Sequence, residues 1–329
     1  MSRSIKIEVV GDNLIFGSSG LLGSGFVEML RGQRQREFYE VDGSSVAFEL
    51  GPESTSANIR AQLNSLVVKK AFYFAGHSNA KTITANLAER ELDTLKFSLK
   101  FLNSIDSLRV FIYSSSVLAS LPKDYLASLH ESDFLGRLTL YSKTKLTAES
   151  IICDYLKSSS IKYVLLNRYT NVFGTFPFGT DSLFSYVLGA ILMPASIIKI
   201  TSAASARINF VYDAEVHRKL VEYVSTLDLD RGPCFKLNYI AEGQSLSISE
   251  WMTRFRGEVN PGSAKFVYGS QRTFWDFFVN PSPLISPDPV DNYHGFQHMV
   301  KEAVQRSTFP QSVLQSQLSK PLRKVADLR

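Results

Sequence analysis

The chain has few cysteines and no long apolar stretch. Only Cys153 and Cys234 occur among 329 residues, too few for a disulfide scaffold and typical of a reducing compartment. No stretch of about 18 apolar residues exists, so a membrane-crossing helix is not expected. The opening residues MSRSIKIEVVGDN lack the apolar core of a signal peptide. These absences predict a cytoplasmic protein with no membrane partner.

Positive charge is present but not gathered into a stripe. The formal net charge is +5, and the densest basic clusters lie at 31–36 and 320–329. A nucleic-acid reader more often shows a basic stripe with interleaved aromatics, or a recognisable motif. The sequence shows neither, so we expect no nucleic-acid partner and a phosphate-bearing small molecule as the anionic ligand.

Apolar residues are plentiful. They make up 44% of the chain, with 23 Phe and 14 Tyr, enough for a large core. The length suits two domains of about 150 residues each, or one large α/β unit.

Short apolar stretches alternate with stretches of helical periodicity up to about residue 170. The alternation predicts an α/β fold with a doubly wound parallel sheet. The expected strands are 13–17, 37–42, 46–50, 70–76, 108–116 and 162–168, and the expected helices are 21–30, 59–66, 87–102 and 142–156. IKIEVV, before the turn GDN, is expected to add an edge strand.

The pattern loosens after about residue 174 into pieces rich in Gly, Pro and Ser. Residues 207–224 again read as a strand followed by a helix. We therefore expect a cofactor domain at 1–173 to which 207–240 returns, and a smaller, irregular substrate domain made of 174–206 and 241–329.

A glycine-rich loop is the first chemical signal. GSSGLLG follows an apolar strand and opens a helix, with glycines at Gly17, Gly20 and Gly23. Such a loop makes a tight turn, lets backbone approach a pyrophosphate and points a helix N-terminus at the anion. The expected cofactor contacts here are Gly17, Ser19, Gly20, Leu21, Leu22 and Gly23.

An acidic residue follows at the expected distance. Asp42 lies 19 residues after Gly23, at the end of the next apolar stretch, where a carboxylate would accept hydrogen bonds from the adenosine ribose. A carboxylate would repel a 2′-phosphate, which favours NAD. Because Arg34 and Arg36 are close in sequence, NADP stays possible.

A tyrosine and a lysine share one helix face. Tyr141 and Lys145 stand at i and i+4, so both side chains can enter one cleft. A nearby ammonium favours the phenolate and so makes tyrosine a better base near neutral pH. Lys143 projects to another face and is expected on the surface.

A serine cluster ends an expected strand. Ser116 lies 25 residues before Tyr141, at the end of a parallel sheet where ligands bind. Its hydroxyl could hold a substrate oxygen, although Ser114 or Ser115 remains an alternative.

With these motifs the chain resembles the extended short-chain dehydrogenase/reductases, in particular the NAD-dependent epimerase/dehydratase family acting on nucleotide sugars. The resemblance implies a Rossmann-like fold and catalysis by Ser116, Tyr141 and Lys145. It also implies that Asn171 lies near the nicotinamide or the substrate diphosphate, and that Arg207 grips the diphosphate. Arg207 stands one residue too early for an ungapped match. The matching segments are GSSGLLG, VDG, FYFAG, FIYSSS, HESD, YSKTK, NRYTNVFG, INFVYDAEV and NYIAEGQSLSISEW.

The chain also departs from the family pattern. Gly51-Pro52 replaces the usual Gly-Asp, and the usual Asn of the fourth helix is replaced within ERELDT at 89–94. Val117 and Leu118 follow the catalytic serine, where sugar 4,6-dehydratases carry an Asp-Glu pair and fucose-synthase-type enzymes use a Cys beside that hydroxyl residue. Dehydration is therefore disfavoured.

Other candidate residues give weaker evidence of a functional role. Ala75, Gly76 and His77 follow an expected strand and are assigned to the cofactor loop, with an ordinary loop role as the alternative for His77. His294 and His298 have no third ligand at a suitable spacing, so no metal site is expected. The aromatic residues at 274–278 are expected to pack in a core rather than stack on a base.

The predicted reaction is hydride transfer at a carbinol carbon of a nucleotide-activated sugar, by an epimerase or a ketoreductase. The alternatives are a reductase of a non-nucleotide carbonyl and a non-enzymatic dinucleotide sensor. By the resemblance, helices 87–102 and 142–156 would pair in a homodimer; alternatively, their apolar faces belong to the core of one chain.

Overall fold

The computed structural model describes most of the chain up to residue 285. The described residues are 5–34, 46–50, 65–80, 82–121, 124–125, 132–157, 159–173, 197–228, 233–241, 245–259, 265–271 and 284–285, with the single positions 59, 61, 63, 273 and 276.

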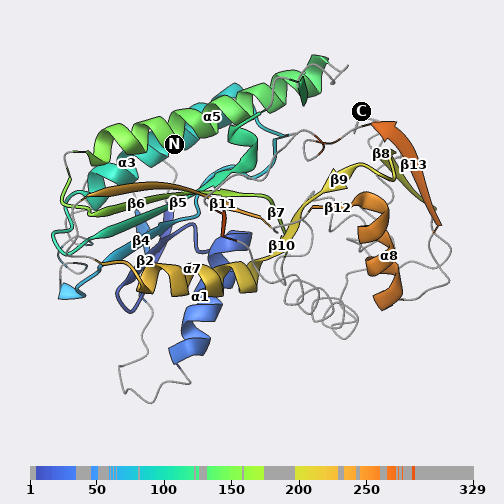
Figure 1. Ribbon diagram of the computed structural model, residues 1–329. Coiled ribbons are helices and arrows are strands. Elements are labelled where there is room, and N and C mark those ends of the chain that lie inside the picture. Colours follow the sequence, from blue (N-terminus) through green and yellow to red (C-terminus); the bar gives the residue numbers. More distant parts are fainter. Residues whose placement is uncertain are drawn as a thin grey trace.

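A mixed sheet forms the centre of the larger lobe (Figure 1). Its strand order is β14-β11-β6-β5-β4-β2-β1-β3, and the six strands from β14 to β2 run parallel. The bounds are β1 Ile5–Val10, β2 Asn13–Phe16, β3 Val46–Leu50, β4 Lys70–Tyr73, β5 Val110–Ser116, β6 Tyr163–Tyr169, β11 Cys234–Ile240 and β14 Leu284–Ile285. The predicted parallel α/β sheet is confirmed.

The N-terminal strand does not lie where the sequence predicted it. β1 forms an antiparallel hairpin with β2 and also pairs antiparallel with β3, so the prediction of an edge strand is wrong. Ile7 is fully buried, as are its neighbours in β2. An apolar strand of this kind gains more from an interior place than from an exposed edge. β1 therefore occupies the place beside β2.

Two layers of helices cover the sheet (Figure 1). α3 (Ala85–Leu102) and α5 (Ser132–Leu156) lie on one face, and α1 (Leu21–Arg34) and α7 (Asp213–Ser225) on the other. Thr84 is the N-cap residue of α3, and its hydroxyl accepts a hydrogen bond from the N–H of Leu87. α5 starts ten residues before the predicted position 142. The described residues between 59 and 65 are helical, as predicted.

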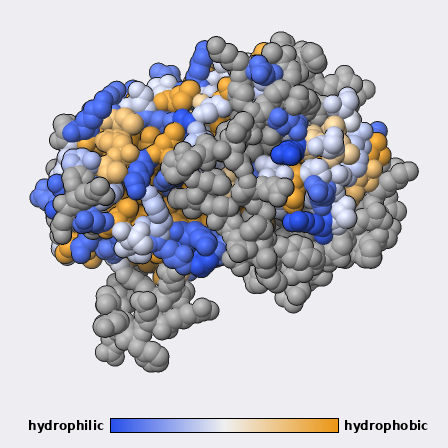
Figure 2. All heavy atoms as spheres, viewed as in Figure 1, coloured by the Kyte–Doolittle hydropathy of each residue, from blue (hydrophilic) through white to orange (hydrophobic). Residues whose placement is uncertain are grey.

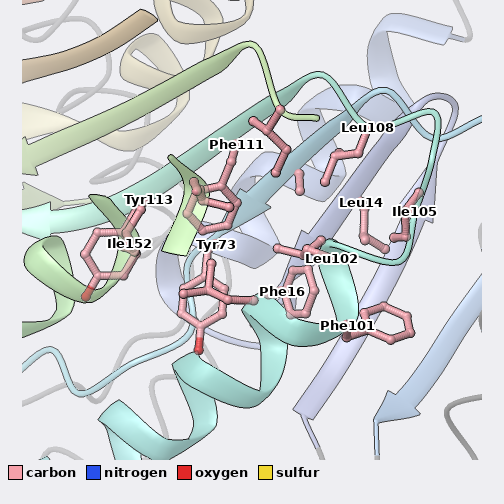
Figure 3. Packing of buried hydrophobic residues seen from close by; sticks show 14 of the residues in the cluster. Leu14, Phe16, Tyr73, Phe101, Leu102, Ile105, Leu108, Phe111, Tyr113 and Ile152 are labelled. Carbon is pink, nitrogen blue, oxygen red and sulfur yellow. The ribbon is translucent and has the colours of Figure 1, made fainter. Parts of the chain in front are cut away.

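The core has one apolar layer on each side of the sheet. Between the sheet and α3 with α5 lie Leu14, Phe16, Tyr73, Phe111 and Tyr113. Figure 3 shows Tyr73 and Tyr113 next to each other in this layer, with ring centroids 5.8 Å apart. The opposite layer packs Ile15, Phe26, Phe72, Ile112 and Leu220 together.

A smaller lobe built from short strand pairs stands at the right of Figure 1. It contains β7 (Asn171–Phe173) with β10 (Phe210–Tyr212), β9 (Arg207–Ile208) with β12 (Leu246–Ser247), β8 (Ile197–Ser202) with β13 (Lys265–Gln271), and α8 (Ile248–Val259). The chain then returns to the main sheet at β14, beside β11. The sequence had not indicated this return.

The described surface has a mixed character. On the face in Figure 2, hydrophilic and hydrophobic residues are interspersed. The large apolar side chains most exposed among the described residues are Leu66, Val67, Leu146, Phe235 and Val267. No helix in the described part of the chain has the length and apolar character needed to cross a membrane.

α7 buries an acid and a histidine one helical turn apart. Asp213 is 2% exposed and accepts the N–H of Ala214 at 2.6 Å, while His217 is 0% exposed beside the ring of Phe26. Burial raises the pKa of Asp213 from 3.8 to about 7. Burial also lowers the pKa of His217 from 6.5 to about 3. Both groups are therefore held in their neutral forms over a wide range of pH.

We expect Asp213→Asn to change how stability depends on pH. The folded protein binds the Asp213 proton more tightly than the unfolded chain, so this residue lowers stability as pH rises from about 4 to about 7. Relative to wild type, Asp213→Asn should gain up to about 4 kcal/mol over that interval. Denaturant unfolding at pH 4, 5.5 and 7 measures the difference.

The matched control is Asp106→Asn, because Asp106 is exposed; it should follow the wild type at each pH. Equal pH slopes for wild type and Asp213→Asn would refute the expectation. His217 acts in the opposite sense, since it adds stability as pH rises from about 3 to about 6.5. It is present in both proteins and cancels in the comparison.

Candidate functional site

The carboxyl ends of three adjacent parallel strands stand in one row. In the sheet register, Phe16 of β2 pairs with Tyr73 of β4, and Tyr73 pairs with Tyr113 of β5. The glycine loop follows Phe16, the loop with Ala75 to His77 follows Tyr73, and the serines follow Tyr113. The sheet therefore brings three of the predicted site segments to one edge.

Two glycines of the first loop are required by close packing. Gly17 has a φ of +78°, and a Cβ there would lie 2.7 Å from the backbone nitrogen of Ala75. A Cβ on Gly23 would lie 2.1 Å from the carbonyl oxygen of Gly17. The turn from β2 into α1 is thus as tight as a phosphate loop requires.

Gly20 differs from the other two. It is exposed, as is Ser19, and its N–H donates to the Gly17 carbonyl at 3.0 Å. A Cβ at Gly20 would meet nothing nearer than the Gly17 oxygen at 3.5 Å, an ordinary contact. The packing of the protein therefore does not require a glycine at this position, and the cofactor contact assigned to Gly20 stays a prediction. α1 begins at Leu21, and Leu22 packs against the apolar cluster of Tyr169, Val211, Val216 and Ile240.

Tyr141 and Lys145 meet on α5 as predicted. Both residues are 4% exposed, and the Lys145 Nζ lies 5.3 Å from the centroid of the Tyr141 ring. The ring packs with Ile83, Ala88 and Leu118. Lys143 is exposed, as the sequence predicted.

Lys145 has a second, unpredicted partner on α3. Its Nζ donates to the Oε1 of Glu91 at 2.7 Å, and both side chains are buried. Burial alone lowers the pKa of Lys145, but the nearby Tyr113, Tyr141 and Glu91 outweigh burial and raise it. Lys145 is therefore a cation throughout the working range of pH.

Ser116 is the last residue of β5. Its Oγ accepts the N–H of Leu118 at 3.2 Å and so begins the short 3-10 helix η1 (Val117–Ala119). Leu118 packs against the cluster of Ile83, Ala88 and Tyr141, and the Ser142 hydroxyl donates to the carbonyl of Ala119 at 3.5 Å. Ser116 and Tyr141 thus belong to one small assembly.

The two alternative serines have other surroundings. The Ser115 Oγ donates to Glu149 at 2.5 Å, which leaves it a structural role. The Ser114 Oγ is buried and lies near the hydroxyl of Tyr169 on β6.

A buried ion pair that sequence reasoning missed supports this region. Arg168, near the end of β6, binds both oxygens of Glu149 on α5 at 2.9 and 2.6 Å. It also donates to Ser120 and to the hydroxyl of Tyr239 on β11. The network joins α5 to three strand ends, and a buried pair of this kind is costly to break. The position of Glu149, one helical turn after Lys145 on α5, was the only signal in the sequence that this carboxylate lies near the site.

The loop after β4 is held by hydrogen bonds. The backbone N–H of His77 donates to the Oε2 of Glu91 at 2.8 Å, and its ring Nε2 lies 2.9 Å from the hydroxyl of Thr82. Ala75 lies against Gly17. The cofactor contacts predicted for Ala75, Gly76 and His77 stay predictions.

The two predicted substrate residues lie on the strands that lead into the smaller lobe. Asn171 is exposed on β7 and donates to the carbonyl of Asn209 at 3.0 Å. Arg207 is exposed on β9, where its N–H donates to Asp276 at 2.9 Å. The diphosphate contacts assigned to these residues stay predictions.

Several predicted features lie outside the described residues. These are Asp42 with its expected strand, Gly51-Pro52, His294 and His298, and most of the aromatic cluster at 274–278. Among the described strands, the neighbours of β2 are β4 and β1. Within the described residues, no group of three or more His, Cys, Asp or Glu gathers as a metal site.

The doubly wound sheet with a glycine loop at its carboxyl edge defines the Rossmann-like class of folds. The model of the NAD dependent epimerase/dehydratase family matches residues 13–227. The chain belongs to this family. No curated protein sequence matches it.

Solved structures share the fold at low sequence identity. MoeE5 in complex with UDP-glucuronic acid and NAD is 19% identical, with a TM-score of 0.63, over 90% of this chain and 100% of that one. UDP-N-acetylglucosamine 4-epimerase from Bacillus cereus is 14% identical, with a TM-score of 0.59, over 88% and 94%. TunA, an NAD-dependent NDP-hexosamine 5,6-dehydratase of tunicamycin biosynthesis, is 16% identical, with a TM-score of 0.59, over 88% and 97%.

We expect alanine at the loop glycines to separate folding from ligand binding. Gly23→Ala places a Cβ 2.1 Å from backbone and should cost about 1–3 kcal/mol of stability, with loss of dinucleotide binding. Gly20→Ala should leave stability unchanged and weaken dinucleotide binding about tenfold or more. Thermal unfolding and fluorescence titration with NAD(H) measure the two effects.

Gly136→Ala is the matched control, because Gly136 lies on α5 with nothing within 4 Å of a new Cβ. It should bind as the wild type does. Unchanged dinucleotide binding by a folded Gly20→Ala would show that no ligand approaches that backbone.

Proposed function

We propose that the protein is an NAD(P)-dependent enzyme that epimerises or reduces a nucleotide-activated sugar, with Ser116, Tyr141 and Lys145 as its catalytic residues. The observation that carries the proposal is the buried pair on α5, with the Lys145 Nζ 5.3 Å from the Tyr141 ring. The serine that ends β5 begins η1, and Leu118 of η1 packs against the cluster that contains Tyr141. Family membership supports the class of substrate.

Each side chain has a distinct task. Tyr141 would take the proton of a sugar hydroxyl during oxidation and return it during reduction. Lys145 would favour the phenolate by its charge and donate a remaining N–H to the cofactor ribose. Ser116, the N-cap residue of η1, would hold the reacting oxygen in line with Tyr141.

The cofactor proposal rests on the glycine loop. Ser19 and Gly20 are exposed at the N-terminus of α1, where backbone N–H groups could bind a pyrophosphate. The bound nicotinamide would supply a hydride acceptor and donor. Structures of the same fold were solved with NAD, as for MoeE5, or with NADPH, as for RMD from Pseudomonas aeruginosa. We propose NAD as the cofactor, with NADP as the alternative.

Two apolar residues argue against sugar 4,6-dehydration. Val117 is 4% exposed and Leu118 packs on Tyr141, so neither position offers an acid or a base. Hydride transfer with proton exchange at one carbon needs no such group. If the keto sugar rotates in the site and is reduced on its other face, the product is an epimer. If the keto sugar is instead released as product or taken up as substrate, the net reaction is an oxidation or a reduction.

We also propose a homodimer that pairs α3 and α5 with their copies. The two helices lie side by side over one face of the sheet (Figure 1), and Leu146 on α5 is 43% exposed. Leu146→Arg should shift the protein toward monomer in sedimentation, with Val267→Arg as the matched control on β13. Equal sedimentation of the two variants would contradict this pairing.

We expect Tyr141→Phe to abolish most of the activity. Loss of the hydroxyl removes the proton acceptor and should lower kcat by about 10²–10⁴-fold, with dinucleotide binding kept. The assay follows UDP-sugars with NAD(H) or NADP(H), and separates epimers by chromatography from net change in cofactor absorbance.

Tyr223→Phe is the control, because Tyr223 is a half-buried tyrosine on α7 that bonds Lys236; it should retain full activity. Turnover retained by Tyr141→Phe would disprove the mechanism. Turnover of a simple carbonyl compound with no binding of any nucleoside diphosphate would instead assign a non-nucleotide substrate.

A further inference from the structure

Glu91 is a buried carboxylate placed inside the proposed site. It lies on α3 with Ala88 and Leu95 as its buried neighbours on the same helix face, and its side chain is 6% exposed. A carboxylate at such a position costs free energy unless it is paired and hydrogen-bonded. Its partners therefore account for its presence.

Both oxygens of Glu91 are used, and by different parts of the fold. Oε1 accepts from the Lys145 Nζ on α5 at 2.7 Å. Oε2 accepts from the backbone N–H of His77, after β4, at 2.8 Å. One side chain thus ties α3 to the catalytic helix and to the loop expected to border the cofactor.

The loop closes directly over the ion pair. A Cβ on Gly76 would lie 3.0 Å from the Oε1 of Glu91 and 3.3 Å from the Lys145 Nζ. Backbone therefore covers the pair on the side of this loop, and the low local dielectric makes the charge of Glu91 effective.

The groups that face Lys145 can be named element by element. They are Glu91 from α3, Tyr73 from β4, Tyr113 from β5 and Tyr141 from α5 itself. Burial raises the pKa of Tyr73 and of Tyr113 above the ordinary range, so both stay neutral. Among these groups Glu91 is the carboxylate that forms an ion pair with Lys145, and it competes with a Tyr141 phenolate for the same ammonium.

From this geometry we infer that Glu91 is a positioning residue that holds Lys145 beside Tyr141 and partly neutralises its charge, so that Glu91 sets the pH at which Tyr141 becomes a base. The inference rests on the proposed function, because it assigns a regulator to the proposed base. An ammonium without this partner would stabilise the phenolate more strongly, and proton abstraction would then begin at lower pH.

The test is the pH profile of Glu91→Gln in the full chain. The acid limb of kcat should move about one pH unit lower, while KM for the UDP-sugar changes less than about twofold, since Glu91 is not assigned a substrate contact. Glu89→Gln is the matched control, because Glu89 is exposed on the same helix; its profile should match wild type. An unmoved acid limb in a folded Glu91→Gln would overturn the inference, even with a lower melting temperature.

A second readout needs no substrate. Tyrosinate absorbance is titrated for wild type and Glu91→Gln, each against the same protein carrying Tyr141→Phe, so that the difference reports Tyr141. We expect the Tyr141 midpoint at lower pH in Glu91→Gln, and equal midpoints would overturn the inference. If wild type turns over no nucleotide sugar, the proposed function fails, while this titration still decides the role of Glu91.

Glu91→Asp covers the case in which Glu91→Gln does not fold. It keeps the charge but withdraws it by about one C–C bond length, so the acid limb and the Tyr141 midpoint should move the same way by a smaller amount. If both stay at the wild-type pH, the inference is overturned.

Discussion

The register of the parallel sheet is the constraint on which the site depends. Phe16, Tyr73 and Tyr113 stand in one row across β2, β4 and β5, so the residues that follow them leave the sheet at the same edge. A slip of one residue would turn every side chain of a strand to the other face. The row is fixed by aromatic packing: Phe16 and Tyr73 lie 5.4 Å apart and Tyr73 and Tyr113 5.8 Å apart, between ring centroids. Core packing and site geometry therefore share one cause.

Buried charge is the second constraint, and the fold meets it by pairing. Lys145 is matched by Glu91, and Arg168 by Glu149. Both pairs begin on α5 and reach a different element, so α5 is anchored to α3 on one side and to β6 on the other. Pairs of this kind add little net stability compared with apolar packing, but breaking one leaves a bare charge in the interior. The two pairs connect the part of α5 that carries Tyr141 to α3 and to β6.

Sequence reasoning succeeded where a feature depends on the spacing of residues that are close together in the chain. The alternation of strands and helices, the glycine loop and the i, i+4 relation of Tyr141 and Lys145 all depend on neighbours within one or two elements. It failed where the partner is distant. No pattern near Glu91 in the sequence indicates that it pairs with Lys145, 54 residues away. The segment ERELDT, which contains Glu91, showed only a departure from the family pattern. Arg168 and Glu149 were missed for the same reason. The early start of α5 was missed because residues 132–141 do not show the clear periodicity on which the prediction relied.

The N-terminal strand shows how spacing can mislead. The ribose contact predicted for Asp42 assumes that the strand following α1 returns to pair with β2, so that its last residue stands beside the glycine loop. β1 is joined to β2 by a short turn, with Gly11 at a φ of +66°, and closing a short turn costs less chain entropy than closing a longer connection. β1 therefore pairs with β2, and β3 pairs with β1. The distance from Gly23 to Asp42 along the chain is that of the family pattern, and the described strand beside β2 on the side away from β4 is β1. The ribose contact assigned to Asp42, which lies outside the described residues, stays a prediction.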